Sequence, residues 1–396
     1  MLGLDDDDVF LDVEPPVTTP LAQTASLGVK QSCVRWLPTA APVALAGSWD
    51  EESTNELSLW CVQVLGDGEM GADVAMHLDG EPSAPPAISA QQAAAVSHPG
   101  DVLGLSIGGG SGPLGGGPLL AFTASGAGGV ACYDIQLADV SAGAGGVLTE
   151  RWRSGSPAGG LATLGVCWGA EAGAVAAVGE DGALTLLSPE RGAAAWSAQT
   201  SEPALFDVCW WDAHVAVAAG TTLGLWDTRI RGAAAAQLVL SPSPGTQAHL
   251  AAQLLTVTAD PQPPYSLAAG ASDGAVHLWD ARAARSAAGG AGGATRGAGE
   301  MPPLRSVNAH AAEVWSVQIA RGAHGHMLTA SSDGTLSAWQ LGGGEAAAGG
   351  DGAGEAVGRT LVQLALPINS LHLSPEHGML ASASDAQVLT FVDLRA

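Results

Sequence analysis

Residues Asn308–Leu341 read NAHAAEVWSVQIARGAHGHMLTASSDGTLSAWQL and are the most regular copy of a unit that recurs along the chain. A turn that contains a histidine leads into an apolar run from Val314 to Ile319. A second run, from Met327 to Ser331, ends in a Ser-Asp-Gly turn, and a third run closes on Trp339. Three short strands joined by tight turns in about 35 residues are typical of one blade of a β-propeller.

Six looser copies of this unit surround it. Their first apolar runs lie at residues 33–38, 98–107, 161–168, 204–211, 250–260 and 368–375. In three units, six residues separate the turn aspartate from the aromatic residue that ends the next strand: Asp273 and Trp279, Asp333 and Trp339, Asp385 and Phe391. A single blade would expose its apolar faces, so the blades must stack around a ring. We therefore predict an all-β fold, a seven-bladed β-propeller.

The ends of the chain suggest how the ring closes. The sequence stops just after the third strand of the seventh unit, so we expect a strand between Val9 and Lys30 to supply the outer strand of the last blade. Residues 1–20 are acidic and are expected to form an N-terminal extension. Residues 21–396 then form the propeller. Its units are lengthened by Gly- and Ala-rich segments such as 286–299 and 342–358, which we expect to be flexible loops.

The composition excludes several classes of function. The formal net charge is −25, and the 14 Lys and Arg residues form no cluster, so we expect no direct binding to nucleic acid. No apolar run approaches the roughly 18 residues that cross a bilayer, so we expect no membrane insertion. The N-terminus lacks the basic start and apolar centre of a secretion signal, which predicts a soluble intracellular protein.

The five cysteines fall in predicted strands and show neither a C-x-x-C pair nor a matched histidine spacing. They are Cys33, Cys61, Cys132, Cys167 and Cys209. This pattern indicates reduced, structural thiols in a cytosolic or nuclear compartment rather than a zinc site.

Three other segments superficially suggest ligand sites. The run GGGSGPLGGG at Gly108–Gly117 lacks the following helix and the Lys of a phosphate-binding loop. His324 and His326 lack a third metal ligand, and Asp5–Asp8 lacks the spaced ligands and glycine of a calcium loop. We therefore expect no metal and no cofactor.

Two strand endings carry a resemblance to a known superfamily. WDTR at Trp226–Arg229 and WDAR at Trp279–Arg282 are similar to the Trp-Asp endings of WD-repeat proteins. Nearly the whole chain follows the pattern. By itself, this resemblance implies only a platform for protein interactions, because propellers carry many unrelated functions.

The resemblance also implies a structural role for one set of polar residues. In the unit quoted above, it implies that His310 is hydrogen-bonded to Asp333 and to Ser331 and Trp339, which would pin the blade. A partial second set comprises His249, Asp273 and Trp279, where Ala271 replaces the serine. A serine, a histidine and an aspartate also occur in hydrolases, but no G-x-S-x-G elbow or oxyanion loop accompanies them. We expect no enzyme activity and no catalytic residue.

A narrower resemblance rests on several segments that occur in a fixed order. They are RW at Arg35–Trp36, GSWD at Gly47–Asp50, LSLW at Leu57–Trp60, HPGDV at His98–Val102, VGEDGALTLL at Val178–Leu187 and AH-x-x-EVW-x-V at Ala309–Val317. Together they resemble the small WD-repeat nucleoporin of the Y-shaped complex in the outer rings of the nuclear pore. The GSWD segment with its polar insertion is the most specific element. The chain departs from this family in its long Gly- and Ala-rich loops and its acidic N-terminal extension.

This resemblance implies a non-catalytic scaffold subunit at the nuclear envelope. It would dock on the α-helical solenoid nucleoporin of the short arm of the Y-complex and support pore assembly, mRNA export and protein transport. We expect no homo-oligomer. The alternatives are a propeller adaptor (a chromatin or ubiquitin-ligase substrate receptor) or a trafficking coat subunit. An adaptor that binds a peptide at the central mouth of the ring needs a charged or aromatic ring of side chains there.

Overall fold

The computed structural model describes most of the propeller region. The described residues are 21–26, 28–49, 54–65, 87–109, 118–137, 145–155, 160–212, 215–230, 236–242, 252–260, 267–280, 301–320, 326–341 and 356–394. Within them the chain forms 28 strands. No helix in these ranges is long and apolar enough to span a membrane.

The described strands form seven four-stranded antiparallel sheets. The first sheet holds β2 (Gln31–Trp36), β3 (Val43–Ser48), β4 (Glu56–Leu65) and β5 (Ala87–Ser97). The second holds β6 (Val102–Gly108), β7 (Leu119–Ser125), β8 (Val130–Leu137) and β9 (Gly146–Arg153). The third holds β10 (Thr163–Gly169), β11 (Ala174–Gly179), β12 (Ala183–Leu187) and β13 (Ala194–Gln199).

The remaining sheets repeat this order. The fourth holds β14 (Asp207–Trp210), β15 (Val215–Ala219), β16 (Leu223–Asp227) and β17 (Ala236–Leu240). The fifth holds β18 (Leu254–Ala259), β19 (Leu267–Ala271), β20 (Ala275–Trp279) and β21 (Arg305–Asn308). The sixth holds β22 (Val314–Ile319), β23 (His326–Ser331), β24 (Thr335–Gln340) and β25 (Val357–Gln363). The seventh holds β26 (Ile368–Ser374), β27 (Met379–Ser384), β28 (Val388–Asp393) and β1 (Leu21–Ser26).

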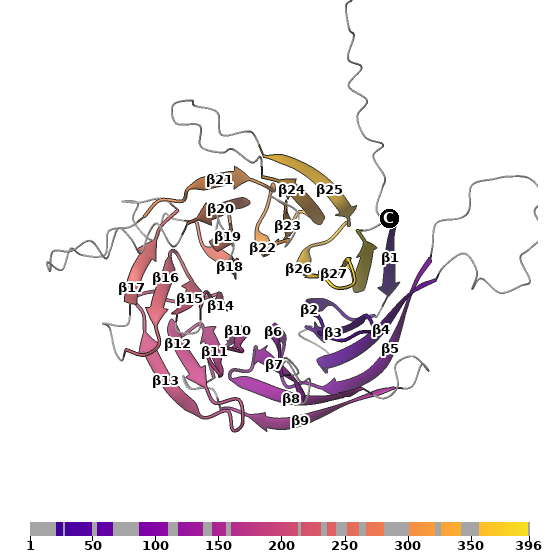
Figure 1. Ribbon diagram of the computed structural model, residues 1–396, viewed down its shortest axis with the longest axis horizontal. Coiled ribbons are helices and arrows are strands. Elements are labelled where there is room, and N and C mark those ends of the chain that lie inside the picture. The colour runs from indigo at the N-terminus through magenta and orange to yellow at the C-terminus, as the bar shows by residue number, and fades with distance from the viewer. Residues whose placement is uncertain are drawn as a thin grey trace, which may run out of the picture.

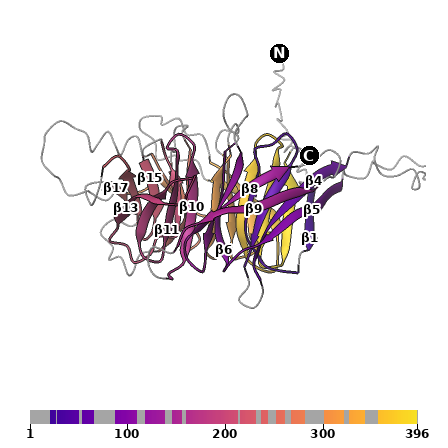
Figure 2. The same ribbon diagram turned by 90° about the horizontal axis from the view of Figure 1, so that it is seen from below.

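The sheets are arranged radially around a central axis (Figure 1). The first strand of each unit lies nearest the axis, and the fourth lies at the perimeter (Figure 1). Seen from the side, the sheets stand next to one another in a disc (Figure 2). The predicted propeller class is thus confirmed.

The hydrophobic core is divided into clusters that lie between neighbouring sheets. One cluster joins the first sheet to the seventh: Val34 and Trp36 pack with Met379 and Phe391, and all four side chains are buried. Burying a side chain of this size contributes roughly 1.5–3 kcal/mol relative to leaving it exposed. The apolar contact between consecutive sheets therefore continues from the last sheet back to the first.

Strand β1 closes the ring by pairing with β28. The antiparallel register runs from Leu21 opposite Asp393 to Ser26 opposite Val388, which makes β1 the outer strand of the seventh sheet. This is the strand that we expected between Val9 and Lys30. Residues 1–20 lie outside the described residues, as do 286–299 and most of 342–358, so the acidic extension and the flexible loops remain predictions.

The Asp-Gly turns that mark the units have a backbone reason. Gly334 has a φ of +80°, and a Cβ atom there would lie 2.3 Å from the carbonyl oxygen of Leu364. The preceding Asp333 accepts a hydrogen bond from the backbone N–H of Thr335 at 2.9 Å. Glycine is therefore required for both its left-handed conformation and the close approach of the neighbouring backbone.

Removal of β1 should destabilise the ring. Deleting residues 1–26 leaves β28 with an unpaired edge, so we expect a melting temperature several degrees lower than that of the full chain. Deleting residues 1–20, which stops just before β1, is the matched control and should leave the melting temperature unchanged. Equal melting temperatures for the two truncated proteins, measured by calorimetry, would contradict a closing role for β1.

Candidate functional site

His310 lies at the centre of a hydrogen-bonded network in the sixth sheet. Its Nδ1 atom is 3.0 Å from Oδ2 of Asp333 and 2.9 Å from Oγ1 of Thr335. Its Nε2 atom is 2.7 Å from Oγ1 of Thr329, and the same oxygen accepts the indole N–H of Trp339 at 2.9 Å. The imidazole of His310 thus joins the loop before β22 to the second and third strands of the sheet, β23 and β24.

The network fixes the direction of each hydrogen bond. The Asp333 carboxylate can only accept, so Nδ1 of His310 carries a proton and donates to it. Nε2 of the neutral imidazole then accepts from the Thr329 hydroxyl, whose oxygen also accepts the indole N–H of Trp339; this tautomer is assigned from the partners. Burial lowers the pKa of His310, and the nearby Asp333 carboxylate opposes this shift only in part. The contact to Asp333 is therefore a hydrogen bond of a neutral histidine at pH 7.

The predicted direct links from His310 to Ser331 and Trp339 are wrong. Thr329 takes the bridging position, while Ser331 Oγ donates to the carbonyl oxygen of Ala312 at 3.2 Å. The register explains the difference. Trp339 is opposite Met327, so Thr329 is its diagonal neighbour, whereas Ser331 lies about 6.6 Å further along the strand.

This geometry also argues against a hydrolase. Ser331 is fully buried, and its hydroxyl bonds to backbone rather than to His310. The hydroxyl that does face His310 belongs to Thr329, which is equally buried and is already shared with Trp339. Neither oxygen can reach a substrate.

The second predicted set is only partly described. His249 lies outside the described residues. Asp273 accepts the backbone N–H of Ala275 at 3.1 Å, so it forms the turn before β20. The indole N–H of Trp279 donates to the carbonyl oxygen of Met301 at 3.4 Å, toward the perimeter of the ring.

A similar network in the second sheet was missed from the sequence. His98 contacts Oγ1 of Thr123 through Nε2 at 2.9 Å and the carbonyl oxygen of Gly100 through Nδ1 at 3.0 Å. Tyr133 packs beside the ring of His98, with 6.2 Å between centroids. The turn of this unit lacks the aspartate, which hid the pattern. The available signal was a histidine followed by a threonine in the second strand, as in the sixth unit.

The irregular first unit places Trp49 at the junction between the first and seventh sheets. Its indole N–H donates to Oδ1 of Asp385 at 3.1 Å, and the ammonium of Lys30 lies 5.2 Å from its ring centroid. Asn369 donates to the same Asp385 oxygen at 2.7 Å and to the carbonyl oxygen of Gln31 at 2.9 Å. Trp49 therefore reinforces the junction that β1 closes.

The thiols offer no nucleophile. All five cysteines are free and lie in strands. Burial raises the pKa of Cys167 to about 11 and that of Cys132 to about 12, and it also raises the pKa of Cys33, Cys61 and Cys209. Since the thiolate is the reactive form, these thiols are inert near neutral pH. Across the described residues, no group of three or more His, Cys, Asp or Glu could hold a metal ion.

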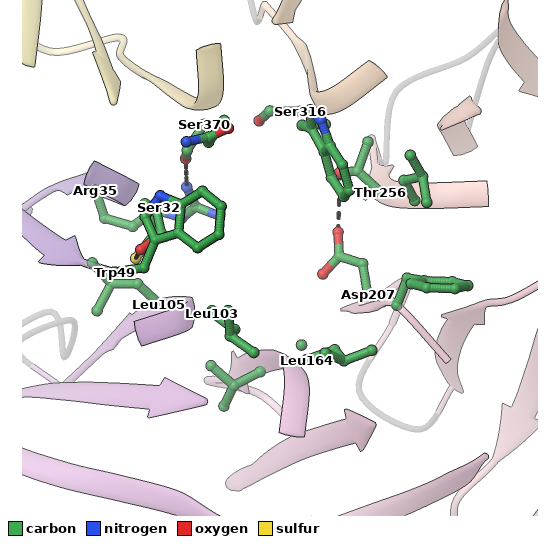
Figure 3. A pocket seen from close by; sticks show the side chains of 18 residues that line it. Ser32, Arg35, Trp49, Leu103, Leu105, Leu164, Asp207, Thr256, Ser316 and Ser370 are labelled. Carbon is green, nitrogen blue, oxygen red and sulfur yellow. Dashed lines mark hydrogen bonds between the residues drawn. The ribbon is translucent and has the colours of Figure 1, made fainter. Parts of the chain in front are cut away.

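A cavity of about 250 Å³ lies on the axis of the ring and is lined by residues from all seven sheets. Arg35 and Asp207 face it from opposite sides (Figure 3). Nη1 of Arg35 donates to Oγ of Ser370 at 3.1 Å. Oδ2 of Asp207 accepts from Oγ1 of Thr256 at 3.1 Å and from the backbone N–H of Val257 at 2.9 Å. Burial raises the pKa of Asp207, and these hydrogen bonds oppose that shift.

The end of this cavity where the inner strands begin has aromatic walls. Trp49, Phe206 and Trp315 all line it, and Trp315 is 41% exposed. The indole N–H of Trp315 donates a hydrogen bond to Oγ of Ser332 at 2.7 Å, which leaves the faces of the ring for other contacts. We call this end the channel mouth.

Comparison with known protein families gives one match. Residues 301–340 match the family described as WD domain, G-beta repeat. They span β21 to β24, the part of the chain that holds the His310 network. A search of curated protein sequences gives no match. The repeat and the propeller arrangement together support the WD-repeat superfamily, whose members are generally non-catalytic interaction scaffolds.

The bridging hydroxyl can be tested by substitution. Thr329→Val removes the shared oxygen and leaves the buried imidazole and indole without a partner, which should cost about 1–3 kcal/mol of unfolding free energy. Thr329→Ser keeps the hydroxyl and should lose much less. Urea denaturation measures both. A Thr329→Val protein as stable as Thr329→Ser would contradict the bridge.

Buried histidines should make the protein less stable in weak acid. Burial lowers the pKa of His372 to about 3, and Nδ1 of His372 accepts the backbone N–H of Trp36 at 3.0 Å. An unfolded histidine has a pKa of about 6.5. Below that pH, His372 therefore binds a proton in the unfolded state but stays neutral in the folded state. The unfolding free energy should then fall by about 1.4 kcal/mol per pH unit for such a histidine.

The measurement is urea unfolding at pH 7.5 and pH 5.5, above the range where most carboxylates titrate. The Asn side chain of His372→Asn can still accept the backbone N–H of Trp36 but cannot titrate. Between pH 7.5 and pH 5.5, the unfolding free energy of this variant should therefore fall by about 1.4 kcal/mol less than that of the unmodified protein. The same decline in the variant and in the unmodified protein would rule out His372 as a source of the pH dependence.

Proposed function

We propose that this protein is a non-catalytic structural subunit of the outer ring of the nuclear pore complex, part of the Y-shaped complex at the nuclear envelope. In this role it supports pore assembly and, through it, mRNA export and protein transport. The coarser part of this function, a scaffold for protein interactions, is supported by the WD-type repeat and the propeller arrangement.

The observation that carries the proposal is the irregular first unit. The GSWD segment was the most specific element of the resemblance, and its Trp49 contacts Asp385 across the junction with the seventh sheet. Asn55, near the end of the polar insertion, donates to Oδ1 of Asp101 at 3.0 Å and so contacts the second sheet as well. The GSWD segment and the insertion that follows it thus together link the first sheet to both of its neighbours, which gives the unusual residues a shared structural role.

The partner that we propose is the α-helical solenoid nucleoporin of the short arm. A propeller suits this role because its sheets are already ordered, so little conformational entropy is lost on binding. Exposed apolar side chains lie on outer strands, including Val147 on β9 and Val357 on β25. Such a rim can pack against helices without rearrangement of the ring.

A second candidate is a peptide-binding adaptor in a chromatin, ubiquitin-ligase or coat assembly. The aromatic side chains of Trp49, Phe206 and Trp315 at the channel mouth favour it, since an adaptor of this kind needs a ring of aromatic or charged groups there.

Affinity purification of the tagged protein, followed by mass spectrometry, separates the two candidates. The nuclear pore proposal predicts recovery of the outer-ring nucleoporins, with the solenoid nucleoporin of the short arm in near-stoichiometric amounts. The tagged protein should also show a punctate nuclear rim by fluorescence imaging. Recovery of a chromatin, ligase or coat complex without nucleoporins would overturn the proposal.

A further inference from the structure

Exposed apolar side chains gather at one end of the ring, away from the channel mouth. Eight large apolar side chains are exposed among the described residues, and five of them lie where a third strand ends or a fourth strand begins: Val147, Ile230, Leu304, Val357 and Leu394. The pairing places these positions at the same end of each sheet, since Val357 is opposite Gln340, the last residue of β24. The channel mouth lies at the other end, where inner strands begin.

Four of these five side chains belong to consecutive sheets. Ile230, Leu304, Val357 and Leu394 lie on the fourth to the seventh sheet, whose outer strands β17, β21, β25 and β1 follow one another along the perimeter (Figure 1). We call these four residues the apolar arc. They are between 37% and 65% exposed. Single exposed apolar residues are ordinary, but the same position on four neighbouring sheets makes a patterned surface, which is typical of an interaction site.

Positive charge accompanies the apolar arc. Each member has an arginine within two residues in the sequence: Arg229 for Ile230, Arg305 for Leu304, Arg359 for Val357 and Arg395 for Leu394. The whole chain has only 14 Lys and Arg residues, so this is a concentration of positive charge in an otherwise acidic protein. Arginine suits an interface because its planar guanidinium binds a carboxylate through two parallel hydrogen bonds.

One of these arginines is held in place by a buried carboxylate. Nε of Arg229 donates to Oδ1 of Asp227 at 2.9 Å, and the side chain of Asp227 is 2% exposed whereas that of Arg229 is 59% exposed. The guanidinium is thus anchored beside Ile230 while much of it faces solvent. A guanidinium has five N–H donors, so Arg229 can also donate to an incoming carboxylate. Arg359 is exposed as well, on β25 near Val357.

The arrangement favours a helical partner over an added strand. An added strand needs one continuous unpaired strand edge, whereas the apolar arc crosses the ends of four sheets and offers side chains only. An amphipathic helix satisfies its own backbone hydrogen bonds and presents apolar side chains along one stripe. Acidic side chains beside that stripe complement the arginines of the arc. Charge complementarity therefore selects an acidic helix.

We infer that the apolar arc is the docking surface for acidic amphipathic helices of a partner protein. The apolar stripe of each helix packs on members of the arc, and Glu or Asp residues beside the stripe pair with the neighbouring arginines. Since the arc repeats from sheet to sheet, a solenoid with helices stacked side by side can engage several members at once. The inference deepens the proposed function, on which it rests for the identity of the partner, and it uses a surface distinct from the channel mouth.

Three fluorescein-labelled peptides of about 18 residues, long enough to form isolated helices, test this chemistry. The first carries Leu at every third or fourth position, Glu on both sides of this stripe and Ala elsewhere. The second has Lys in place of Glu, and the third has the composition of the first with Leu distributed around the helix. Fluorescence anisotropy with the full chain, at about 0.15 M salt to screen distant charges, should show that the first peptide binds about tenfold more tightly than the third.

Paired variants locate the binding. Leu304→Ser together with Val357→Ser removes the two most exposed members of the arc and should weaken the first peptide by about tenfold. Leu161→Ser together with Leu366→Ser, at residues 44% and 48% exposed at the channel-mouth end of the sheets, is the matched control and should bind like the unmodified protein.

A charge reversal separates the arginines from the apolar contacts. Arg359→Glu should weaken the Glu peptide by roughly fivefold, because a carboxylate then faces a carboxylate, and should leave the Lys peptide bound no more weakly than before. No binding of the Glu peptide, equal binding of the peptide with distributed Leu, or equal loss in the two paired variants would overturn the inference. The comparison of peptides on the unmodified protein decides it even if a variant folds poorly.

Affinity purification of the same variants separates this inference from the proposed function. The protein with Leu304→Ser and Val357→Ser should lose the solenoid nucleoporin that the unmodified protein recovers, and the matched control should retain it. Full recovery by the arc variant would overturn the arc and leave the nuclear pore proposal intact. Recovery of no nucleoporin by the unmodified protein, with the peptide results as expected, would overturn the nuclear pore proposal and leave the arc in place.

Discussion

Each sheet of this protein has two apolar faces, and the burial of both faces is the constraint on which the rest of the structure depends. Side chains from one sheet pack against the next around the axis, and the cluster of Trp36 and Phe391 brings the last sheet against the first. Without that contact, the first and last sheets would each expose an apolar face to water. The ring and its central cavity follow from this requirement.

Much of this fold could be predicted from the sequence because the spacing of residues within the repeated unit indicates where its strands begin, turn and end. The six-residue spacing from turn aspartate to aromatic residue reflects a hairpin in which Asp333 and Gly334 form the turn and Trp339 lies near the end of β24. The need for an extra strand in the last sheet followed from counting strands, and β1 fills that place. Both features depend only on spacing within a short segment or on the number of strands, so they can be recognised in a single sequence.

The candidate sites were less predictable, since they depend on which of two similar residues has the right register. Thr329 and Ser331 lie on the same face of β23, and only the pairing of Met327 with Trp339 shows that Thr329 is the closer of the two. The β-bulges at the start of the inner strands were equally hidden. A one-residue shift in pairing leaves no mark in composition, so Leu164 and Trp315 looked like ordinary strand residues.

The pairing of β1 with β28 also has a consequence in time. A ribosome makes Ser26 about 370 residues before it makes Asp393. At about 5–20 residues per second, β1 waits on the order of 20–70 s for its partner. During that interval an unpaired strand is available to other chains in the cell. The ring of a newly made chain therefore closes only after nearly the whole sequence has been synthesised.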